Sequence, residues 1–145
     1  MTNNQTKTIF RVIDANLNRS REGLRVCEEI ARFVLNSRPL TKDLKSVRHG
    51  ISGIIKKSSG RLGALPASRD SEGDVLRCSR LESEMKRRGL ADIFAANMER
   101  TKESLRVLEE FFKLIDNKAA AEFCGLRFKV YTIEKKAMKR LDDTD

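Results

Sequence analysis

The chain has 145 residues, of which 39% are hydrophobic, 35% are charged and 6% are aromatic, with a formal net charge of +9. This length suits one domain, and high charge with few aromatic residues favours helices with charged outer faces over a β-sandwich or barrel. No segment approaches the roughly 18 consecutive apolar residues of a membrane span. Residues 1–8 do not resemble a secretion signal, so we expect a soluble cytoplasmic protein that does not bind membranes.

The charge and the cysteines restrict the partners and the redox chemistry. An excess of basic residues attracts polyanions, which include nucleic acid and phosphorylated small molecules. The 30 basic residues are interleaved with 21 acidic ones and aromatic stacking residues are few, which argues against nucleic acid. Cys27, Cys78 and Cys124 are odd in number and form no C-x-x-C pair, so we expect reduced structural thiols without a disulfide or a zinc site.

Two amphipathic helices are predicted before residue 58. Apolar residues at helical spacing predict a first helix over residues 9–36, with Thr8 as N-cap and Pro39 closing the segment. The second helix is expected over residues 41–57, capped by Thr41, and the short link makes the pair an antiparallel hairpin. The inward-facing positions are Ile13, Leu17, Leu24, Cys27 and Ala31 in the first helix, and Leu44, Val47, Ile51, Ile54 and Ile55 in the second.

The rest of the chain begins with a predicted loop. Residues 58–75 are rich in serine and glycine, which break helical periodicity. Residues 76–88 are expected to hold a short helix that ends at Gly89. Two further helices are predicted over residues 90–116 and 119–141, followed by a tail at 142–145.

An internal repeat links the two halves of the chain. Residues 15–34 align with residues 96–115 with nine identities in twenty positions, and the second helices match at an offset of 79, for example at Arg48/Arg127. Two such hairpins can bury their apolar faces against each other. We therefore predict an all-α four-helix bundle with approximate twofold symmetry in a single domain, residues 1–145. Its parts are repeat 1 at about 9–57, a loop and short helix at 58–89, and repeat 2 at about 90–141.

The repeated polar residues on the first helix of each hairpin form one candidate site. They are Asn16, Arg19 and Glu22 in repeat 1 and Asn97, Arg100 and Glu103 in repeat 2. Helical geometry places Asn16 at the edge of the apolar stripe, whereas Arg25 and Glu28 lie nearly opposite and are expected to be solvated. The six residues could line a polar cleft in which arginine binds phosphate and the amides or carboxylates position a substrate or metal ion. Alternatively they form Arg/Glu pairs that tie helices together, each contributing about 0.2–0.5 kcal/mol when exposed.

The central loop is the second candidate site. Arg69, Asp70, Gly73 and Asp74 form an R-D-x-x-G-D sequence that places two carboxylates and an arginine around a turn. Asp70 and Asp74 are candidate ligands for Mg²⁺, which often shares its coordination shell with substrate phosphates. A solubilising turn has the same composition, but a loop of about 18 residues in a compact domain is usually functional or disordered.

Three further groups are weaker candidates. Arg48 and Arg127 recur in both hairpins and would serve either as phosphate ligands or as helix-pairing residues. The serine-glycine run at residues 58–61 could offer backbone N–H groups to an anion, but it lacks the order of a P-loop. The lone His49 is more typical of a surface or packing residue than of a catalytic base.

Three segments together resemble a known family. They are residues 13–34 with L-R-V-C-E-E, residues 69–75 with R-D-S-E-G-D, and residues 95–111 with L-R-V-L-E-E. The combination is similar to the small helical family of alternative hydroxymethylpyrimidine phosphate kinases of thiamin biosynthesis, which also occurs fused in front of thiamine phosphate synthase. The resemblance spans about residues 10–139, with Cys27 where an aliphatic residue is commoner and Leu76 where a small residue is expected.

The resemblance implies an activity. It is the transfer of the terminal phosphoryl group of ATP to 4-amino-5-hydroxymethyl-2-methylpyrimidine phosphate, with Mg²⁺ as cofactor. Phosphoryl transfer depends mainly on positioning and charge neutralisation, which arginines and a magnesium ion supply. In the expected scheme Asp70 and Asp74 hold magnesium, Arg19, Arg69 and Arg100 contact phosphates, Asn16 and Asn97 orient the pyrimidine or a phosphate, and Glu22 or Glu103 assists the attacking hydroxyl.

Two other interpretations remain open at this stage. A non-catalytic helical module could bind a partner enzyme of thiamine phosphate synthesis or dimerise through apolar grooves. A basic bundle could bind RNA, in which case its affinity would fall steeply with salt. The symmetric hairpins also make a homodimer or larger assembly a reasonable expectation, with the site formed within one chain or between subunits.

Overall fold

The computed structural model describes residues 1–63, 65–77 and 82–144, and within these ranges it contains helices and no strand. Four long helices dominate, which confirms the predicted all-α bundle. They are α1 (Asn3–Glu29), α2 (Arg38–Leu62), α3 (Leu90–Phe112) and α4 (Asn117–Asp142). Shorter elements are a π-helix at Ile30–Val34 and 3₁₀-helices at Leu65–Ser68 and Glu82–Met85. In the described ranges, no helix combines the length and apolar character needed to cross a bilayer.

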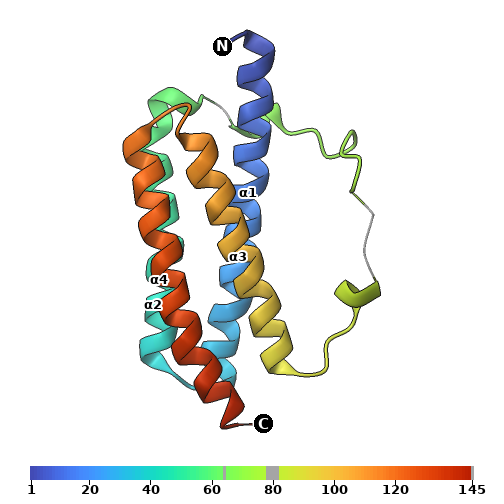
Figure 1. The fold of residues 1–145 in the computed structure, drawn as a ribbon, viewed down its shortest axis with the longest axis vertical. Helices are drawn as coiled ribbons and strands as arrows, with labels where there is room; N and C mark the ends of the chain where they lie inside the picture. The colour runs from blue at the N-terminus through green and yellow to red at the C-terminus, as the bar shows by residue number, and fades with distance from the viewer. Residues whose placement is uncertain (64, 78–81, 145) are drawn as a thin grey trace.

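The long helices form two antiparallel hairpins that pack against each other (Figure 1). α1 pairs with α2 and α3 with α4, while α1 also packs on α3 and α2 on α4. The unduplicated connection from α2 to α3 runs from one end of the bundle to the other, beside α1 and α3 (Figure 1). Both repeats therefore contribute to one core. The connection adds Leu65 to it, whereas its described residues from 69 onward are exposed.

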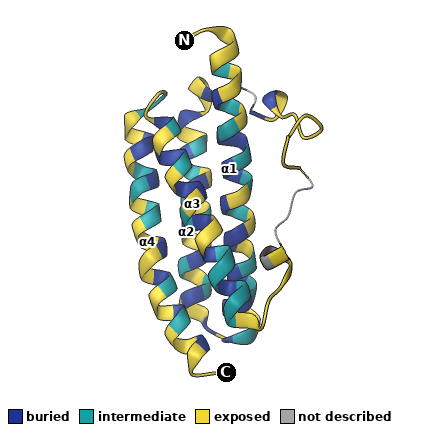
Figure 2. Cartoon of the chain, turned by 45° about the vertical axis from the view of Figure 1, so that its right-hand side comes forward, coloured by how far each residue is buried: buried dark blue, intermediate teal, exposed yellow. Residues whose placement is uncertain are grey.

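The core follows the predicted apolar stripes. All five predicted positions on the first helix are at most 2% exposed, and in α2 only Ile55 of the predicted set is half-buried rather than buried. Phe94, Phe112 and Phe123 are fully buried, and the rings of Phe112 and Phe123 lie 4.9 Å apart between centroids. Buried residues line the inner faces of the helices, while the first turns of α1 and most of the central loop are exposed (Figure 2).

The first helix begins earlier than predicted, so the assignment of Thr8 as N-cap is wrong. Thr2 caps α1 instead, because its hydroxyl accepts a hydrogen bond from the backbone N–H of Gln5 (3.2 Å). In return, the Gln5 side chain accepts one from the Thr2 backbone N–H (2.9 Å). This reciprocal capping box has the sequence signature T-x-x-Q, which outweighs the absence of apolar residues in the first turns.

The turn between α1 and α2 also differs from the prediction. Asn36 adopts a left-handed conformation (φ 46°), which asparagine tolerates better than most residues, and this ends the first helical segment. Ser37, not Thr41, caps α2, and Pro39 lies in its first turn. Proline is favoured there because its missing N–H would have no intrahelical partner. The proline therefore starts the second helix rather than closing the first.

The remaining boundaries shift in the same way. α2 continues to Leu62 and ends at Gly63, whose φ of 54° is left-handed, so the predicted loop start at residue 58 is wrong and the serine-glycine run is helical. Between residues 76 and 88 the described part contains only the 3₁₀-helix Glu82–Met85, and residues 78–81 lie outside the described ranges. Asp116 caps α4 by accepting hydrogen bonds from the backbone N–H groups of Lys118 and Ala119, so α4 begins two residues before the predicted start.

α1 and α3 approach each other closely at Gly23. A Cβ atom placed on Gly23 would lie 2.8 Å from the carbonyl oxygen of Asn97 and 2.5 Å from the hydroxyl oxygen of Thr101. Backbone atoms cannot move aside as a flexible side chain can, so this position requires glycine. The contact fixes the separation of the two helices that carry the repeated polar residues.

We expect Gly23→Ala to lower the free energy of unfolding by about 1–3 kcal/mol, because the new methyl group would push α1 away from α3. Gly53→Ala is the matched control, since nothing lies within 4 Å of its Cβ position in α2. That substitution should stabilise the protein by about 0.5–1 kcal/mol by restricting the unfolded chain. Urea unfolding followed by circular dichroism measures both changes, and equal stability of the two variants would contradict the close-packing argument.

Candidate functional site

Two adjoining hollows open between α1, α3 and the central loop. The first, of about 400 Å³, lies between α1 and residues 69–74, and the second, of about 620 Å³, lies between α1, α3 and residues 74–77. Asn16, Arg19 and Asp74 line both of them. We call the pair of hollows the loop groove. It brings together seven of the predicted site residues, which are Asn16, Arg19, Arg69, Asp70, Asp74, Arg100 and Glu103.

The two asparagines make the same local bond in each repeat. The side-chain amide of Asn16 donates to the carbonyl of Val12 (2.9 Å), and that of Asn97 donates to the carbonyl of Ile93 (2.8 Å). Asn16 is 5% exposed, and its side-chain oxygen is the group left to accept from a ligand. Asn97 lies against Gly23 and lines neither hollow of the loop groove. The shared bond also explains why a mediocre helix former occurs twice at this position.

Three of the arginines that line the second hollow form no ion pair within the described part of the chain. Arg19 and Arg100 are exposed, and neither forms an ion pair with any residue in the described ranges; the same holds for Arg77. Arg19 and Arg100 occupy equivalent positions in the two repeats, so their presence in one hollow places this hollow at the junction between the repeats. Guanidinium groups with unused donors are typical of sites that bind phosphate or carboxylate.

The loop groove is not symmetric. Glu103 lines the second hollow, whereas its repeat partner Glu22 is exposed and lines neither. The central loop covers the side of Asn16, and no second copy of the loop covers the side of Asn97. Both hairpins thus supply residues to the loop groove, but the central loop covers only the side formed by the first hairpin.

The loop is attached to α1 by two arginines. The guanidinium of Arg69 donates to both carboxylate oxygens of Asp14 (2.7 and 2.8 Å), and Asp14 is only 7% exposed. This hydrogen bond raises the pKa of Arg69. From α1, Arg11 donates to the backbone carbonyl of Asp70 (3.3 Å). The sequence analysis did not single out Asp14. The feature that could have revealed it is its position directly after Ile13, which was predicted to face the core.

The two loop carboxylates shape the turn. One oxygen of Asp70 accepts from the backbone N–H of Gly73 (2.9 Å), and one oxygen of Asp74 accepts from the backbone N–H of Leu76 (3.0 Å). The other oxygen of Asp70 lies 3.9 Å from the guanidinium of Arg11 in an ion pair, and the other oxygen of Asp74 makes no such contact with a described residue. Among the described residues, no three carboxylate, histidine or cysteine side chains gather into a metal site. A divalent cation here would need phosphate oxygens and waters to complete its shell, which is the usual situation for Mg²⁺.

Arg48 and Arg127 lie outside the loop groove, in ion pairs that join the two helices of each hairpin. Arg48 donates to Glu28 (2.6 and 3.2 Å), and Arg127 donates to Glu109 (3.2 and 2.9 Å). The hydrogen bond to Glu28 raises the pKa of Arg48, against the opposing effect of burial. Glu28 is 4% exposed, so its expected solvation is wrong. The prediction assumed that α1 buries only one apolar stripe. Because α1 contacts both α2 and α3, Glu28 is also covered, on the side where it meets Arg48 of α2.

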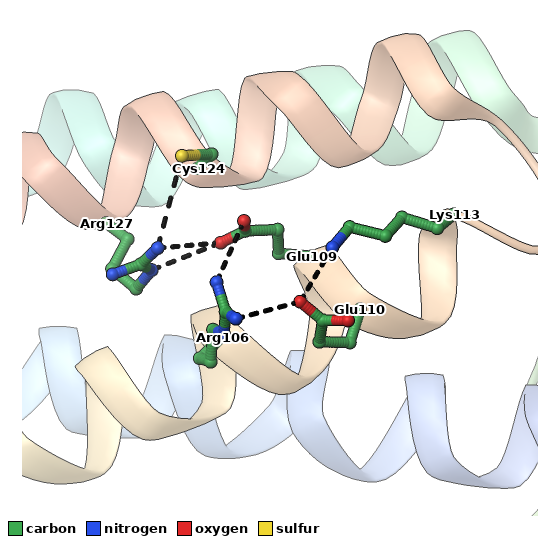
Figure 3. Close-up of polar contacts among 6 residues, drawn as sticks. All are labelled: Arg106, Glu109, Glu110, Lys113, Cys124 and Arg127. Carbon is green, nitrogen blue, oxygen red and sulfur yellow. Dashed lines mark hydrogen bonds and ion pairs between the residues drawn. The ribbon is translucent and has the colours of Figure 1, made fainter.

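Each pair is part of a larger repeated network. In repeat 2, Arg106 contacts Glu109 (3.1 Å) and Glu110 (3.0 Å), and Arg127 approaches Glu109 from α4 (Figure 3). In repeat 1, Arg25 contacts Glu28 and Glu29 in the same way. The L-R-V-x-E-E sequence therefore encodes a structural network, in which the buried glutamate and its partner arginine balance each other's charge.

Of the two cysteines in the described part of the chain, Cys27 has the buried environment of a structural thiol. Cys27 is buried, donates to the carbonyl of Phe94 (3.6 Å) and has a pKa raised by burial. Cys124 is a free, half-buried thiol. Cys78 lies outside the described residues. His49 is exposed, as expected of a surface residue.

The comparisons with known proteins agree with this organisation. The model of the ThiD2 family matches residues 11–136, which include both repeats and the central loop. The chain belongs to the ThiD2 family. Thiamine-phosphate synthase of Rhodopirellula baltica is 40% identical over 131 residues, which cover 90% of this chain and 34% of that protein. The thiamine-phosphate synthase of Synechocystis sp. is 39% identical over 126 residues, covering 87% of this chain and 35% of that protein.

This ThiD2-family chain spans about a third of the length of the curated relatives it matches. A third such relative, the thiamine-phosphate synthase of Nostoc punctiforme, is 36% identical over 132 residues, or 91% of this chain and 36% of that protein. No solved structure matches the chain. The relatives therefore show homology of the helical segment.

We expect Glu109→Ala to destabilise the fold by about 3 kcal/mol, because it leaves the largely buried guanidinium of Arg127 without its counter-charge. Glu110→Ala is the control, since Glu110 is exposed and its ion pairs lie at the surface. Denaturant unfolding should show a large shift for the first variant and little change for the second. Equal effects would contradict the structural role assigned to the buried pair.

Proposed function

We propose that this chain is a kinase that transfers the terminal phosphoryl group of ATP to 4-amino-5-hydroxymethyl-2-methylpyrimidine phosphate in thiamin biosynthesis. The observation that carries the proposal is the convergence of Arg19 and Arg100, one from each repeat, on a groove bordered by the acidic turn at Asp74. Neither arginine is neutralised by a residue in the described ranges. A site with unpaired arginines next to carboxylates suits a phosphate substrate that brings a divalent cation.

Membership of the ThiD2 family supports a role in thiamin biosynthesis. The relatives are named thiamine-phosphate synthase, and this chain matches about a third of each. The double L-R-V-x-E-E pattern with R-D-x-x-G-D between its copies also resembles the hydroxymethylpyrimidine phosphate kinases. The two hollows, of about 400 and 620 Å³, are of the size that small-molecule sites occupy, which leaves room for a pyrimidine phosphate beside a nucleotide.

Phosphoryl transfer requires charge neutralisation more than covalent chemistry. Arg19 and Arg100 would bind the phosphates of donor and acceptor. The oxygens of Asp70 and Asp74 that accept no hydrogen bond from the loop backbone would hold Mg²⁺ directly or through water, with that of Asp70 also facing Arg11. When bound, the cation would offset the negative charge that develops between the phosphates. Arg69 is already paired with Asp14, so its contribution would be to hold the loop in place.

The acceptor chemistry changes the role of the glutamates. A diphosphate forms when a phosphate oxygen of the pyrimidine monophosphate attacks the terminal phosphorus of ATP; the bond to the bridging oxygen breaks and ADP leaves. A phosphate monoester is largely dianionic near pH 7, because its second pKa is about 6, so the earlier expectation of a glutamate acting on a hydroxyl is not required. Glu103 and the side-chain oxygen of Asn16 would instead accept hydrogen bonds from the pyrimidine amino group.

The test is to mix the purified chain with MgCl₂, ATP and the pyrimidine monophosphate and to follow the products by phosphorus NMR. The proposal predicts the paired resonances of an organic diphosphate together with ADP. The pyrimidine alcohol without phosphate is the control acceptor. Absence of diphosphate product across a wide range of pH and divalent metals would contradict the proposal.

We expect Arg19→Ala and Arg100→Ala each to lower kcat/KM at least about 100-fold, because each removes a charge-assisted contact to phosphate in the transition state. Asp74→Asn should cause a comparable loss. Arg21→Ala is the matched control, since Arg21 lies on the same helix but points to Ser52 of α2 (3.5 Å). Near-normal activity in the Arg19 and Arg100 variants would place the chemistry elsewhere.

Arg69→Ala should reduce turnover at least about 100-fold while leaving the helical circular-dichroism signal unchanged, because it removes the bidentate one of the two arginine contacts between the loop and α1 without touching the core. Asp14→Ala should produce a similar loss, since it removes the other half of the same pair. A variant of Asp14 with full activity would show that Arg69 acts through another contact.

A further inference from the structure

A third hollow, of about 540 Å³, lies at the turn of the first hairpin. It is formed by the end of α1, the π-helix Ile30–Val34 and the first turns of α2. It shares no lining residue with the loop groove. Arg32 follows Arg19 by 13 residues, which corresponds to roughly 20 Å along a helix axis. We call this hollow the turn pocket.

The turn pocket is strongly basic. Its lining includes six basic residues and two acidic ones, Glu28 and Glu29. Arg25 and Arg48 are paired with these glutamates. The other four cations form no ion pair with a residue in the described ranges, and they are Arg32, Arg38, Lys42 and Lys45. Like charges held together in one hollow repel one another, and an anion placed between them relieves that repulsion.

The internal repeat shows that these cations are not needed to build a hairpin. The second hairpin keeps the glutamate–arginine pair as Glu109–Arg127. However, it has Ala121 where the first has Lys42, Cys124 where the first has Lys45, and Asn117 where the first has Arg38. The second hairpin folds with the same helices but without the cluster. Three of the four unpaired cations are therefore an addition to a framework that does not require them. The fourth, Arg32, aligns with Lys113, which differs in being paired with Glu110.

We propose that the turn pocket binds a small anion that carries at least two phosphate charges, at a site separate from the loop groove. The buried Glu28 and its half-buried partner Arg48 line one side of the pocket, and the four unpaired cations supply the donors. The volume suits a small phosphorylated molecule. The site does not depend on the proposed kinase activity, because none of its residues belongs to the loop groove.

The experiment is calorimetric titration of the 145-residue chain with inorganic diphosphate, without magnesium or nucleotide. About 150 mM potassium chloride limits interactions between exposed charges to a range of about 8 Å. An Arg19→Ala/Arg100→Ala background removes the arginines of the loop groove, so that the remaining binding reports on the turn pocket. In this background we expect saturable binding with one diphosphate per chain.

Lys42→Ala/Lys45→Ala, which brings the first hairpin closer to the second, should then weaken diphosphate binding at least tenfold. Lys56→Ala/Lys136→Ala removes the same net charge from exposed helical positions and should change the affinity less than about threefold. Arg38→Asn, which copies Asn117, is a second variant that should also weaken binding. Circular dichroism of each variant verifies that the helices remain.

Several results would overturn the proposal. They are an absence of binding in the Arg19→Ala/Arg100→Ala background, or an equal loss of affinity from the Lys56/Lys136 control. A poly-glutamate peptide that binds more tightly than diphosphate would assign the pocket to an acidic protein partner instead. Absence of kinase activity in the separate NMR assay leaves the diphosphate titration unaffected, so the two proposals fail independently.

Discussion

The packing of α1 against α3 is the constraint on which the rest of the structure depends. Gly23 lets the two backbones approach, and this contact brings Arg19 and Arg100 into one hollow although 81 residues separate them in the sequence. The buried pairs Glu28–Arg48 and Glu109–Arg127 then join each of these helices to its hairpin partner. A buried pair adds little net stability compared with apolar packing, but its loss exposes an uncompensated charge, so it favours one helix register over others.

Comparison of the two repeats separates structural residues from those free to carry function. The Glu–Arg networks and the asparagine bonds to the preceding turn occur in both, which is expected of groups that stabilise a hairpin. Features found once are the central loop anchored by Arg69 and the unpaired cations of the turn pocket. The two proposed sites combine residues common to both repeats, Arg19 and Arg100, with the central loop and the cations that occur only once.

Apolar periodicity and the internal repeat were enough to predict the bundle, the core stripe of α1 and four residues of the loop groove, although Glu22 and Asn97, predicted in the same way, lie outside it. The loop residues of the groove were predicted from the R-D-x-x-G-D sequence. The boundaries were less predictable, because a capping box at Thr2 and Gln5 extends α1 without any apolar residue, and Pro39 is compatible with either the end or the start of a helix. Asp14 and Glu28 were missed for one physical reason. A helical wheel assigns charged residues to solvent, but the arginine that makes burial tolerable comes from a distant segment.

The central claim is that the two repeats form one phosphate site rather than two independent ones. A double-mutant cycle on kcat/KM with Arg19→Ala, Arg100→Ala and the combined variant measures this directly. If both guanidinium groups contact the same bound phosphates, the combined loss should fall short of the product of the single losses by at least about tenfold, or about 1.4 kcal/mol of coupling. Losses that multiply without coupling would contradict a shared site.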